Sequence, residues 1–360
     1  MGSGPASSGR PTISDVAAAA GVGRASAARA LGGYGAVSPE LRRRVEEAAA
    51  ALGYRSNALA RNLSLGSSRT LGVVVADIAN PFFAGVVRGI TDTARRAGLD
   101  TVVLNTDEDL DDEAHAVEVL LEKSVDGLVV ATAAGADAPV PHLHEAAAQV
   151  PLVLVDRVVH GLAVDSVTID NAAAARAGTA ALLEAGHRRV GLVWGPALQP
   201  VPAQRGRLLS ALDSAVSTGA DRVRGYLDAL RAARVPFDPD LVALTESTVE
   251  AAQDATDRML DLPDPATALL TTDDFALLGV LRVLGRRGLR PGADVSLVGF
   301  DDVPWAELWS PPLTMIAQPL LALGTEVAEL LLARIGGRDD PPRAVRLPAQ
   351  LVRRDSIGPR

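Results

Sequence analysis

The chain has 360 residues, of which 48% are hydrophobic and 22% are charged, a composition typical of a globular protein with two or three domains. The absence of cysteine excludes disulfide bonds, thiolate metal sites and a cysteine nucleophile. The net charge of −9 is unevenly spread, because residues 1–69 hold nine arginines and only four acidic residues.

A basic segment on an acidic body is typical of a protein in which only that segment meets nucleic-acid phosphates. A chance cluster of arginines on solvated helices explains the same charges, and charge alone does not decide between the two. Residues 1–11 are rich in Gly, Ser and Pro, which indicates a disordered tail rather than an export signal. No run of about 18 apolar residues occurs, so we expect a cytoplasmic protein without a membrane partner.

Three short helices are predicted near the N-terminus, over residues 13–20, 24–31 and 38–52. The first has apolar residues at i, i+3 and i+4, and Gly21 separates it from the second. Ser38 can cap the third helix, and Gly53 ends it. Two helices joined by a tight turn with glycine form a helix-turn-helix unit, so residues 12–56 are predicted to be a helix-turn-helix domain.

Residues 57–70 are predicted to be a hinge helix and a linker. The stretch 57–63 is amphipathic but too short to be a stable helix alone in water. A segment rich in Gly and Ser follows it over 64–70.

From residue 71 onward, apolar runs of strand length alternate with alanine-rich amphipathic helices. The expected strands are 71–75, 101–104, 127–130, 152–155, 190–194, 241–244, 268–270 and 295–298. This alternation predicts βαβ units with parallel sheets that are buried on both faces. The 290 residues of 71–360 exceed what one doubly wound sheet needs, so two similar lobes are predicted, with ligand binding beyond the carboxyl ends of the strands.

Motifs spread over residues 12–355 resemble those of the lac/gal repressor family. They include Thr12-Ile-x-Asp-Val-Ala-x-x-Ala-Gly-Val, Asn57-Ala-Leu-Ala-Arg, Asp77-Ile-x-Asn-Pro-Phe-Phe, Asn105-Thr-Asp-Glu-Asp, Val125-Asp-Gly-Leu and Val295-Ser-Leu-Val-Gly-Phe-Asp-Asp. Each motif alone is weak, but their order and spacing are specific. The resemblance implies an all-α helix-turn-helix head plus an α/β two-lobed body like that of periplasmic binding proteins, with two doubly wound parallel sheets, in a homodimeric transcriptional repressor.

The resemblance further implies that the second helix enters the major groove of operator DNA. The residues that would face the bases are Arg24, Ala25 and Arg29, and Ser26 could bind a phosphate or a base. An arginine matches the O6 and N7 acceptors of guanine, and one such pair contributes about 1–3 kcal/mol of discrimination. The alternative for these arginines is an ordinary solvated surface.

Four other residues are assigned to the DNA by the same resemblance: Thr12, Asn57, Ala60 and Leu63. Leu63 would be a wedge that unstacks a base step in the minor groove, and Ala60 would let the hinge helices of two subunits approach closely. The alternative, in which Leu63 only packs on the body, stays open.

Between the lobes, the resemblance implies a small polar effector, a sugar or a nucleoside. The residues that would bind it are Phe82, Phe83, Asp156, Arg222, Asp273 and Asp301. Carboxylates accept hydrogen bonds from hydroxyl groups and arginine donates them, as a polyol requires. The alternatives are that the phenylalanines belong to the core, and that Asp156 and Asp301 are helix caps.

The remaining features predict no catalytic chemistry. His142 and His144 are expected on a surface loop, and the acidic run 107–113 is expected to be a solvated helix start. Neither a phosphate-binding loop nor a nucleophile elbow occurs, so no enzyme, cofactor or metal is expected. Residues 198–214 are interpreted as an insertion of unassigned role. The alternative function is a sugar-binding protein of the periplasmic type without DNA function, which would need an export signal and no basic head.

Overall fold

The structure is a computed structural model that describes residues 11–32, 35–54, 67–193, 200–246 and 248–360. The chain divides into two compact units. Unit 1 consists of residues 1–70 together with 124–126, and unit 2 consists of residues 71–123 and 127–360.

The described part of unit 1 contains three helices, α1 (Ile13–Ala20), α2 (Arg24–Gly32) and α3 (Pro39–Leu52). Gly21 and Gly53 end α1 and α3 in the left-handed conformation, with φ values of 66° and 63°, as the predicted helix stops require. The Ser38 hydroxyl caps α3 by accepting a hydrogen bond from the backbone N–H of Leu41 (3.3 Å). The core of the three helices is small and mostly alanine: Val16, Ala17, Ala20, Ala27, Ala30, Val45 and Ala49.

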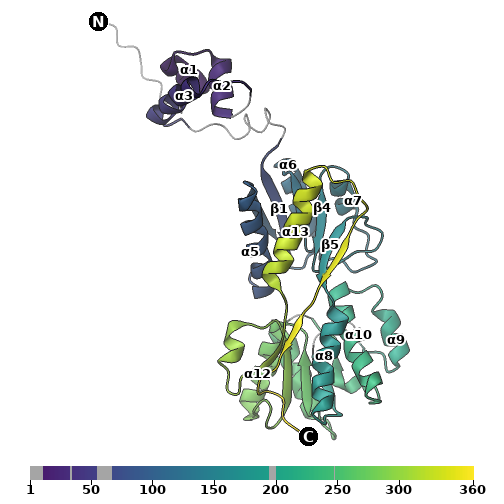
Figure 1. Cartoon of the computed structure of the whole chain (residues 1–360). Coiled ribbons are helices and arrows are strands. Elements are labelled where there is room, and N and C mark those ends of the chain that lie inside the picture. The colour runs from purple at the N-terminus through teal and green to yellow at the C-terminus, as the bar shows by residue number, and fades with distance from the viewer. Residues whose placement is uncertain (1–10, 33–34, 55–66, 194–199, 247) are drawn as a thin grey trace. The chain divides into compact units, whose positions relative to one another are not determined.

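Unit 2 contains two lobes, each built on a six-stranded sheet (Figure 1). In lobe 1 the strand order is β11-β5-β4-β3-β1-β2. Its strands are β1 (Thr70–Val75), β2 (Asp100–Asn105), β3 (Gly127–Val130), β4 (Leu152–Val155), β5 (Asp165–Ile169) and β11 (Ala344–Leu347). Its helices are α5 (Pro81–Arg96), α6 (Leu110–Glu122), α7 (Pro141–Ala147) and α13 (Leu320–Ile335).

In lobe 2 the strand order is β12-β10-β9-β8-β6-β7. Its strands are β6 (Val190–Val193), β7 (Val242–Ala243), β8 (Ala268–Thr271), β9 (Ser296–Phe300), β10 (Thr314–Ala317) and β12 (Gln350–Val352). Its helices are α8 (Asn171–Glu184), α9 (Arg205–Ala211), α10 (Ser217–Ala232), η1 (Pro239–Leu241), α11 (Val249–Leu260), α12 (Asp274–Arg287) and η2 (Pro304–Glu307).

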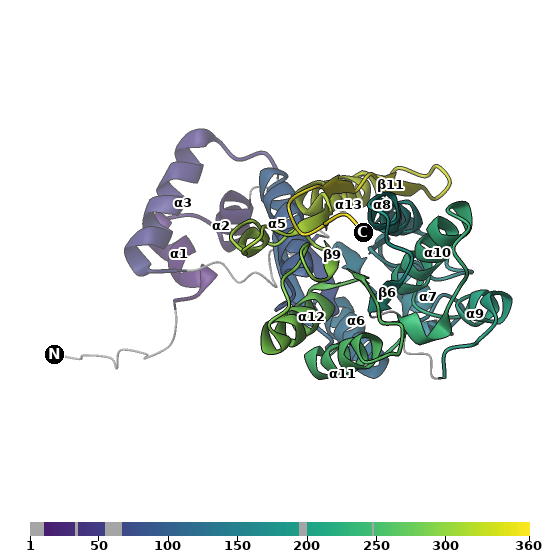
Figure 2. The ribbon, with the colours of Figure 1, turned by 90° about the horizontal axis from the view of Figure 1, so that it is seen from below.

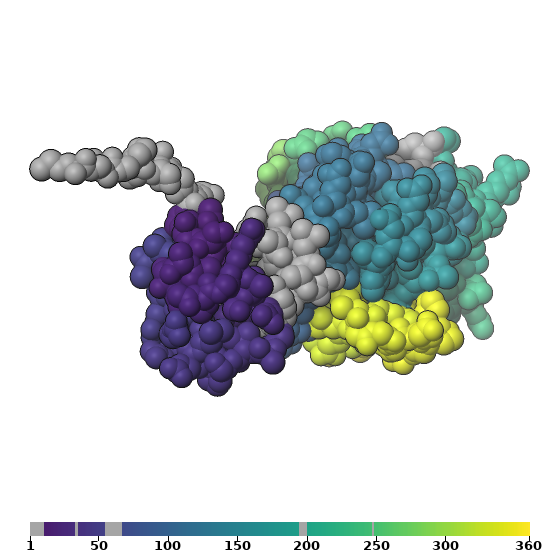
Figure 3. All heavy atoms as spheres, turned by 90° about the horizontal axis from the view of Figure 1, so that it is seen from above, coloured from purple at the N-terminus to yellow at the C-terminus, as the bar shows by residue number. Residues whose placement is uncertain are grey.

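The chain passes between the lobes three times: after β5, after β10 and after β11. The last two crossings enclose α13, which follows β10 of lobe 2 closely in the sequence but packs in lobe 1 against α5, β3, β4 and β5 (Figures 1 and 2). Seen from above, α13 and the residues after it form one margin of lobe 1, in yellow in Figure 3. The described strand pairs are parallel except for β10 with β12, which confirms two sheets that are mainly parallel.

Helices α5 and α13 cross in close backbone contact. A Cβ atom built on Gly324 would lie 2.1 Å from the carbonyl oxygen of Val86, and one built on Gly89 would lie 2.5 Å from that of Leu321. Only glycine fits at these two positions, because any side chain would collide with backbone that cannot move aside. Gly89 and Gly324 therefore fix the position of α5 against α13 in lobe 1.

The sequence predicted most of the strands and missed four. The missed strands are β5, β10, β11 and β12. β5 is fully buried but contains Asp165, Ser166 and Thr168, so its sequence lacks the apolar run by which a buried strand is predicted. β11 is half exposed at the edge of its sheet, where no buried face imposes an apolar pattern.

Candidate functional site

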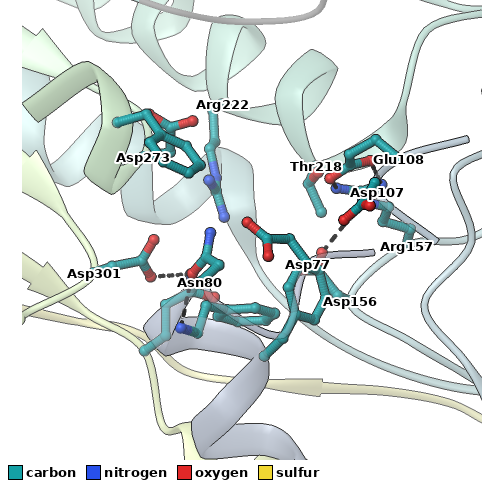
Figure 4. Close-up of a pocket in the computed structure, with 14 residues that line it drawn as sticks. Asp77, Asn80, Asp107, Glu108, Asp156, Arg157, Thr218, Arg222, Asp273 and Asp301 are labelled. Atoms are coloured by element: carbon teal, nitrogen blue, oxygen red, sulfur yellow. Dashed lines mark hydrogen bonds and ion pairs between the residues drawn. The ribbon is translucent and has the colours of Figure 1, made fainter. Parts of the chain in front are cut away.

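A cavity of about 250 Å³ lies between the two lobes at the carboxyl ends of their strands. Its walls are formed by Asp77, Asn80, Phe82, Phe83, Asp107, Glu108, Asp156, Arg157, Thr218, Arg222, Asp273, Phe275, Asp301 and Gln318 (Figure 4). The six residues predicted from the sequence for an effector all lie in this lining. Their convergence follows from topology, because the carboxyl ends of parallel strands meet at one edge of a sheet.

The start of α5 brings aromatic side chains to the cavity. The Asn80 side chain caps the helix by accepting a hydrogen bond from the Phe82 N–H (2.8 Å), and Pro81 occupies the first helical turn. Phe82 and Phe83 meet edge to face with ring centroids 5.0 Å apart. Both are buried in the core of the lobe as well as lining the cavity, so the two interpretations of these residues do not exclude each other.

Arg222 on α10 is buried and held in a fixed orientation. Its Nε donates to the side-chain oxygen of Asn171 (2.8 Å) and its Nη1 donates to the carbonyl of Thr272 (2.5 Å). The guanidinium stacks on the Phe300 ring at 4.2 Å from its centroid. Figure 4 shows the group reaching from its helix towards Asn80 and the carboxylates. A planar donor fixed in this way can hold a ligand oxygen in one place.

The second buried arginine, Arg157, is engaged by the protein itself. Its two terminal nitrogens donate to the Glu108 carboxylate at 2.5 and 2.7 Å, and one of them also donates to the carbonyl of Thr132 (3.1 Å). Its Nε lies 3.5 Å from an oxygen of Asp156. Arg157 therefore neutralises acidic groups of the wall.

Two predicted aspartates follow strands directly and have raised pKa values. Burial raises the pKa of Asp301 to about 6, against the opposing effects of Arg222 and of a hydrogen bond from Gln318. Burial also raises the pKa of Asp156, although Arg157 and Arg222 oppose the shift. Neither residue is the cap of a described helix.

The capping role belongs to the third predicted aspartate. An Asp273 side-chain oxygen accepts a hydrogen bond from the Ala276 N–H (2.6 Å) at the start of α12. Asp273 also lines the cavity, so its carboxylate has both a structural and a site-facing position.

Several wall residues were not predicted to bind a ligand. Asp77 and Asn80 lie inside a motif that was noted, and Glu108 lies in the acidic run, so the sequence carried signals for these three. Phe275 and Gln318 were not singled out in the sequence, which carried no signal for them. The Gln318 side-chain nitrogen donates to Asp301 (2.6 Å), while its oxygen is buried without a described hydrogen-bond partner.

The acidic run was only partly a solvated helix start. Asp109 caps α6, but Glu113 is fully buried and accepts hydrogen bonds from Thr132 and from the backbone of Ala133. His142 lies on α7 rather than on a loop, and its Nε2 is 2.8 Å from a Glu113 oxygen. Buried carboxylates need such partners, and the segment after β3 and helix α7 supply them.

In unit 1, the residues predicted to face bases gather on α2. Arg24, Ala25 and Arg29 are exposed and Ser26 is half buried, whereas Ala27 and Ala30 face the core. The Arg29 Nε donates to the carbonyl of Ala25 (3.3 Å).

Thr12 has a local structural role at the start of α1, where its backbone N–H and its hydroxyl donate to the Asp15 carboxylate at 2.7 and 2.8 Å. Asn57, Ala60 and Leu63 lie outside the described residues, as does part of the segment 198–214. The described end of that segment contains α9.

The described residues contain neither a helix able to span a membrane nor a cluster of metal ligands. None of their helices combines the length and the apolar character needed to cross a membrane. No group of three or more His, Asp or Glu side chains among them is arranged to hold a metal ion.

Two family models match the chain. The model of bacterial regulatory proteins of the lacI family matches residues 12–57. The model of periplasmic binding proteins and the sugar-binding domain of the LacI family matches residues 68–355. The first match places a DNA-binding domain before the two-lobed body, so a periplasmic-type protein without DNA function is not favoured.

Similar proteins support the same assignment over nearly the whole length. The transcriptional repressor CytR of Escherichia coli (strain K12) is 33% identical over 328 residues, which cover 91% of this chain and 90% of CytR. A complex of the transcriptional regulator CelR with cellobiose has a TM-score of 0.69 at 33% identity and covers 96% of this chain and 100% of that one. The lac repressor dimer bound to operator and the anti-inducer ONPF has a TM-score of 0.80 at 26% identity and covers 97% and 99%.

Proposed function

Because this chain belongs to the LacI family of bacterial regulatory proteins, we propose that the cavity between its lobes binds a small polar effector that controls operator binding by the N-terminal helices. The chain is a DNA-binding transcriptional regulator and not an enzyme. Under this proposal it acts as a repressor in the cytoplasm. Residues 12–56 bind DNA, 57–70 form the hinge and linker, and 71–360 bind the effector and dimerise.

The charges of the cavity oppose the binding of anionic effectors. Six carboxylates and two arginines line it, which leaves a formal excess of four negative charges. Arg157 is already paired with Glu108, and it therefore offers little attraction to a phosphate or carboxylate of a ligand. In a buried site of low dielectric constant, such an excess repels anions strongly. The effector is an uncharged or cationic molecule.

The polar and aromatic groups together fit a sugar or a nucleoside. Asp156, Asp273 and Asp301 can accept hydrogen bonds from neighbouring hydroxyls, and Arg222 can donate to a ring or hydroxyl oxygen. Phe82, Phe83 and Phe275 provide apolar surface for the face of a ring. A cavity of about 250 Å³ holds on the order of eight water molecules at about 30 Å³ each, which suits a compact ligand.

The DNA-binding part of the proposal rests on α2. Arg24, Ala25 and Arg29 contact base edges in the major groove, Ser26 contacts a phosphate or a base, and Thr12 contacts the DNA beside them. Asn57, Ala60 and Leu63 form the hinge helix that enters the minor groove of the operator.

Homodimer formation is supported by large apolar side chains that are exposed on unit 2. They are Ile78, Leu278, Trp305, Leu308, Trp309 and Leu321. Leu308 is 80% exposed. Trp305 and Trp309 are close to it in the sequence, and their ring centroids lie 6.2 Å apart. Trp305, Leu308 and Trp309 lie within five consecutive residues, and we assign this apolar segment to contact with a second copy of the chain, because two half-sites of an operator require two heads.

The switch follows from two lobes that share one ligand. An effector that contacts both lobes favours the lobe arrangement in which all its contacts form, and it shifts the equilibrium only by its difference in affinity between the two states. A coupling of about 1–3 kcal/mol is typical for such regulators.

The observation that carries the proposal is the convergence of Asp156, Arg222 and Asp301 from both lobes on one cavity. We would screen sugars, nucleosides and sugar phosphates by thermal shift and then measure operator binding with each hit, using a duplex selected from a random pool by the protein. A neutral sugar or nucleoside should raise the melting temperature and change operator affinity, and Arg222→Ala should abolish both effects while operator binding persists. Effects that survive Arg222→Ala, or hits confined to sugar phosphates, would contradict the proposed site.

A further inference from the structure

One carboxylate in unit 1 holds three consecutive residues of the linker. The Ser67 hydroxyl and the Arg69 backbone N–H donate to one oxygen of Asp126 at 2.6 and 2.8 Å. The Ser68 N–H and hydroxyl donate to the other oxygen at 2.7 and 3.1 Å. Hydrogen bonds to a charged acceptor are about twice as strong as neutral ones, so both oxygens of Asp126 are committed to this segment. We call the segment, residues 67–69 with Asp126, the linker clasp.

The backbone of the linker is shaped to fit this carboxylate. Arg69 has a φ of 52°, which a residue with a side chain adopts only where its surroundings demand it. This conformation turns the N–H groups of Ser68 and Arg69 towards the same carboxylate, an arrangement that suits an anion. The Ser67 hydroxyl also accepts a hydrogen bond from the Arg69 N–H (3.2 Å). The charge on Asp126 thus helps to compensate this bend.

The clasp lies at the starts of two neighbouring strands. The Asp126 N–H donates to the Thr70 carbonyl (2.8 Å), and the next residues along each chain, Leu71 and Gly127, begin the parallel pairing of β1 with β3. The cavity residue Asp77 follows the other end of β1. At about 3.3 Å per residue, the six residues of β1 separate the two places by roughly 20 Å.

We infer that Asp126 is a positioning residue for operator binding: it fixes the direction in which the linker leaves the sheet, and thereby places the hinge segment and the α1–α3 helices for specific DNA contact. Asp126 touches neither DNA nor effector in this scheme. The inference rests on the proposed function and adds a residue to it. The clasp joins the linker to the start of β3. A movement of this end of β3 therefore shifts the linker directly and does not have to be transmitted along β1.

The test uses the full chain and DNA alone. Asp126→Asn keeps the size of the side chain but replaces one accepting oxygen with an amide nitrogen, so it loses two of the four hydrogen bonds. Asp100→Asn is the matched control, since Asp100 is an exposed acid on β2 with the same charge and no linker contact among the described residues. Each variant is titrated with a duplex selected by the wild-type protein and with a random duplex of equal length, and its melting temperature is recorded.

We expect Asp126→Asn to weaken binding of the selected duplex at least tenfold and to leave binding of the random duplex within twofold, while Asp100→Asn changes neither. Ser68→Ala, which removes one donor and leaves the carboxylate, should show a smaller loss of the same kind. Hydrogen exchange at the amides of Ser68 and Arg69 should become faster in Asp126→Asn and remain unchanged in Asp100→Asn.

Unchanged specificity in Asp126→Asn would overturn the inference and leave the proposed function intact. A lower melting temperature with equal losses on both duplexes would show a merely structural role and would also overturn it. If Asp126→Asn does not fold, the two duplexes are compared in Ser68→Ala. A loss confined to the selected duplex supports the inference, and unchanged binding or equal losses on both duplexes overturn it. If the wild-type chain prefers no duplex, the proposed function fails and the inference falls with it.

Discussion

Asp156 and Asp301 occupy matching places in the two lobes. Each directly follows a strand, β4 or β9, and each has a positive φ, 67° and 65°. The N–H of each donates to a carbonyl of the adjacent strand at 2.9 Å, that of Val167 on β5 and that of Ile316 on β10. The electrostatic influence of Arg222 reaches both carboxylates. Two similar lobes thus present equivalent acids to one arginine, and a ligand between them contacts both halves of the switch.

The pH dependence of effector binding should reveal the state of Asp301. Its pKa of about 6 means that the carboxylate gains a proton as the pH falls through 6, and a ligand hydroxyl that donates to the carboxylate then loses its acceptor. Affinity for the effector should be about tenfold weaker at pH 5 than at pH 8. The groups that act on Asp301 are Arg222, Gln318, Asp274 and Asp156.

Asp301→Asn should remove this pH dependence and should also weaken effector binding. Because the folded pKa lies above the ordinary value, ionised Asp301 costs stability in the ligand-free protein above pH 6, and this cost disappears as the pH falls. The variant should therefore be more stable than the wild type at pH 7.5, on the order of 1–3 kcal/mol, and similar to it near pH 4. Titration by calorimetry and denaturant unfolding measure the two effects, and an unaltered pH profile in the variant would contradict the assignment.

We expect α2 to contribute more to the binding of a specific duplex than to the binding of random DNA. Arg29→Ala should weaken binding of the selected duplex by about 1–3 kcal/mol and affect random DNA much less. Arg43→Ala is the control, because Arg43 is an exposed arginine of α3 that pairs with Glu47 (2.8 Å). Equal losses on both duplexes in Arg29→Ala would make Arg29 a phosphate contact only.

The Glu108–Arg157 pair should contribute to stability as well as to the charge of the cavity. Glu108→Gln leaves the buried Arg157 with only the more distant Asp156 carboxylate, 3.5 Å from its Nε, and we expect a loss of about 1–3 kcal/mol, moderated by the partial exposure of Glu108. Glu118→Gln, at an exposed site on α6, should stay within about 0.5 kcal/mol of the wild type. Denaturant unfolding measures both, and equal stabilities would show that Arg157 does not need Glu108.

The contact of α5 with α13 should tolerate no side chain. Gly324→Ala places a methyl group 2.1 Å from the Val86 carbonyl oxygen and should destabilise the body by about 1–3 kcal/mol or more. Gly285→Ala is the control within a helix, since a Cβ there meets nothing within 4 Å and should stabilise by about 0.5–1 kcal/mol. Opposite signs for the two changes are expected in thermal or denaturant unfolding.

The sequence alone determined the local elements and the residues that sit in short motifs. The helices of unit 1 begin and end where Ser38, Gly21 and Gly53 act within a few residues of themselves, so they are readable without a fold. The cavity residues were predicted from the resemblance to the lac/gal repressor family. Asp156 and Asp301 directly follow strands, whereas Arg222 lies within α10. Parallel topology then brings such positions together.

Only the tertiary structure decided which side chains are partners. Glu108 and Arg157 are 49 residues apart, and Asp301 and Gln318 are 17 apart, so no local pattern links either pair. The edge strands β11 and β12 and the capping role of Asp273 were equally hidden. The physical reason is that backbone conformation depends mainly on near neighbours, whereas the pairing of buried charges depends on which chain segments the packed sheets bring side by side.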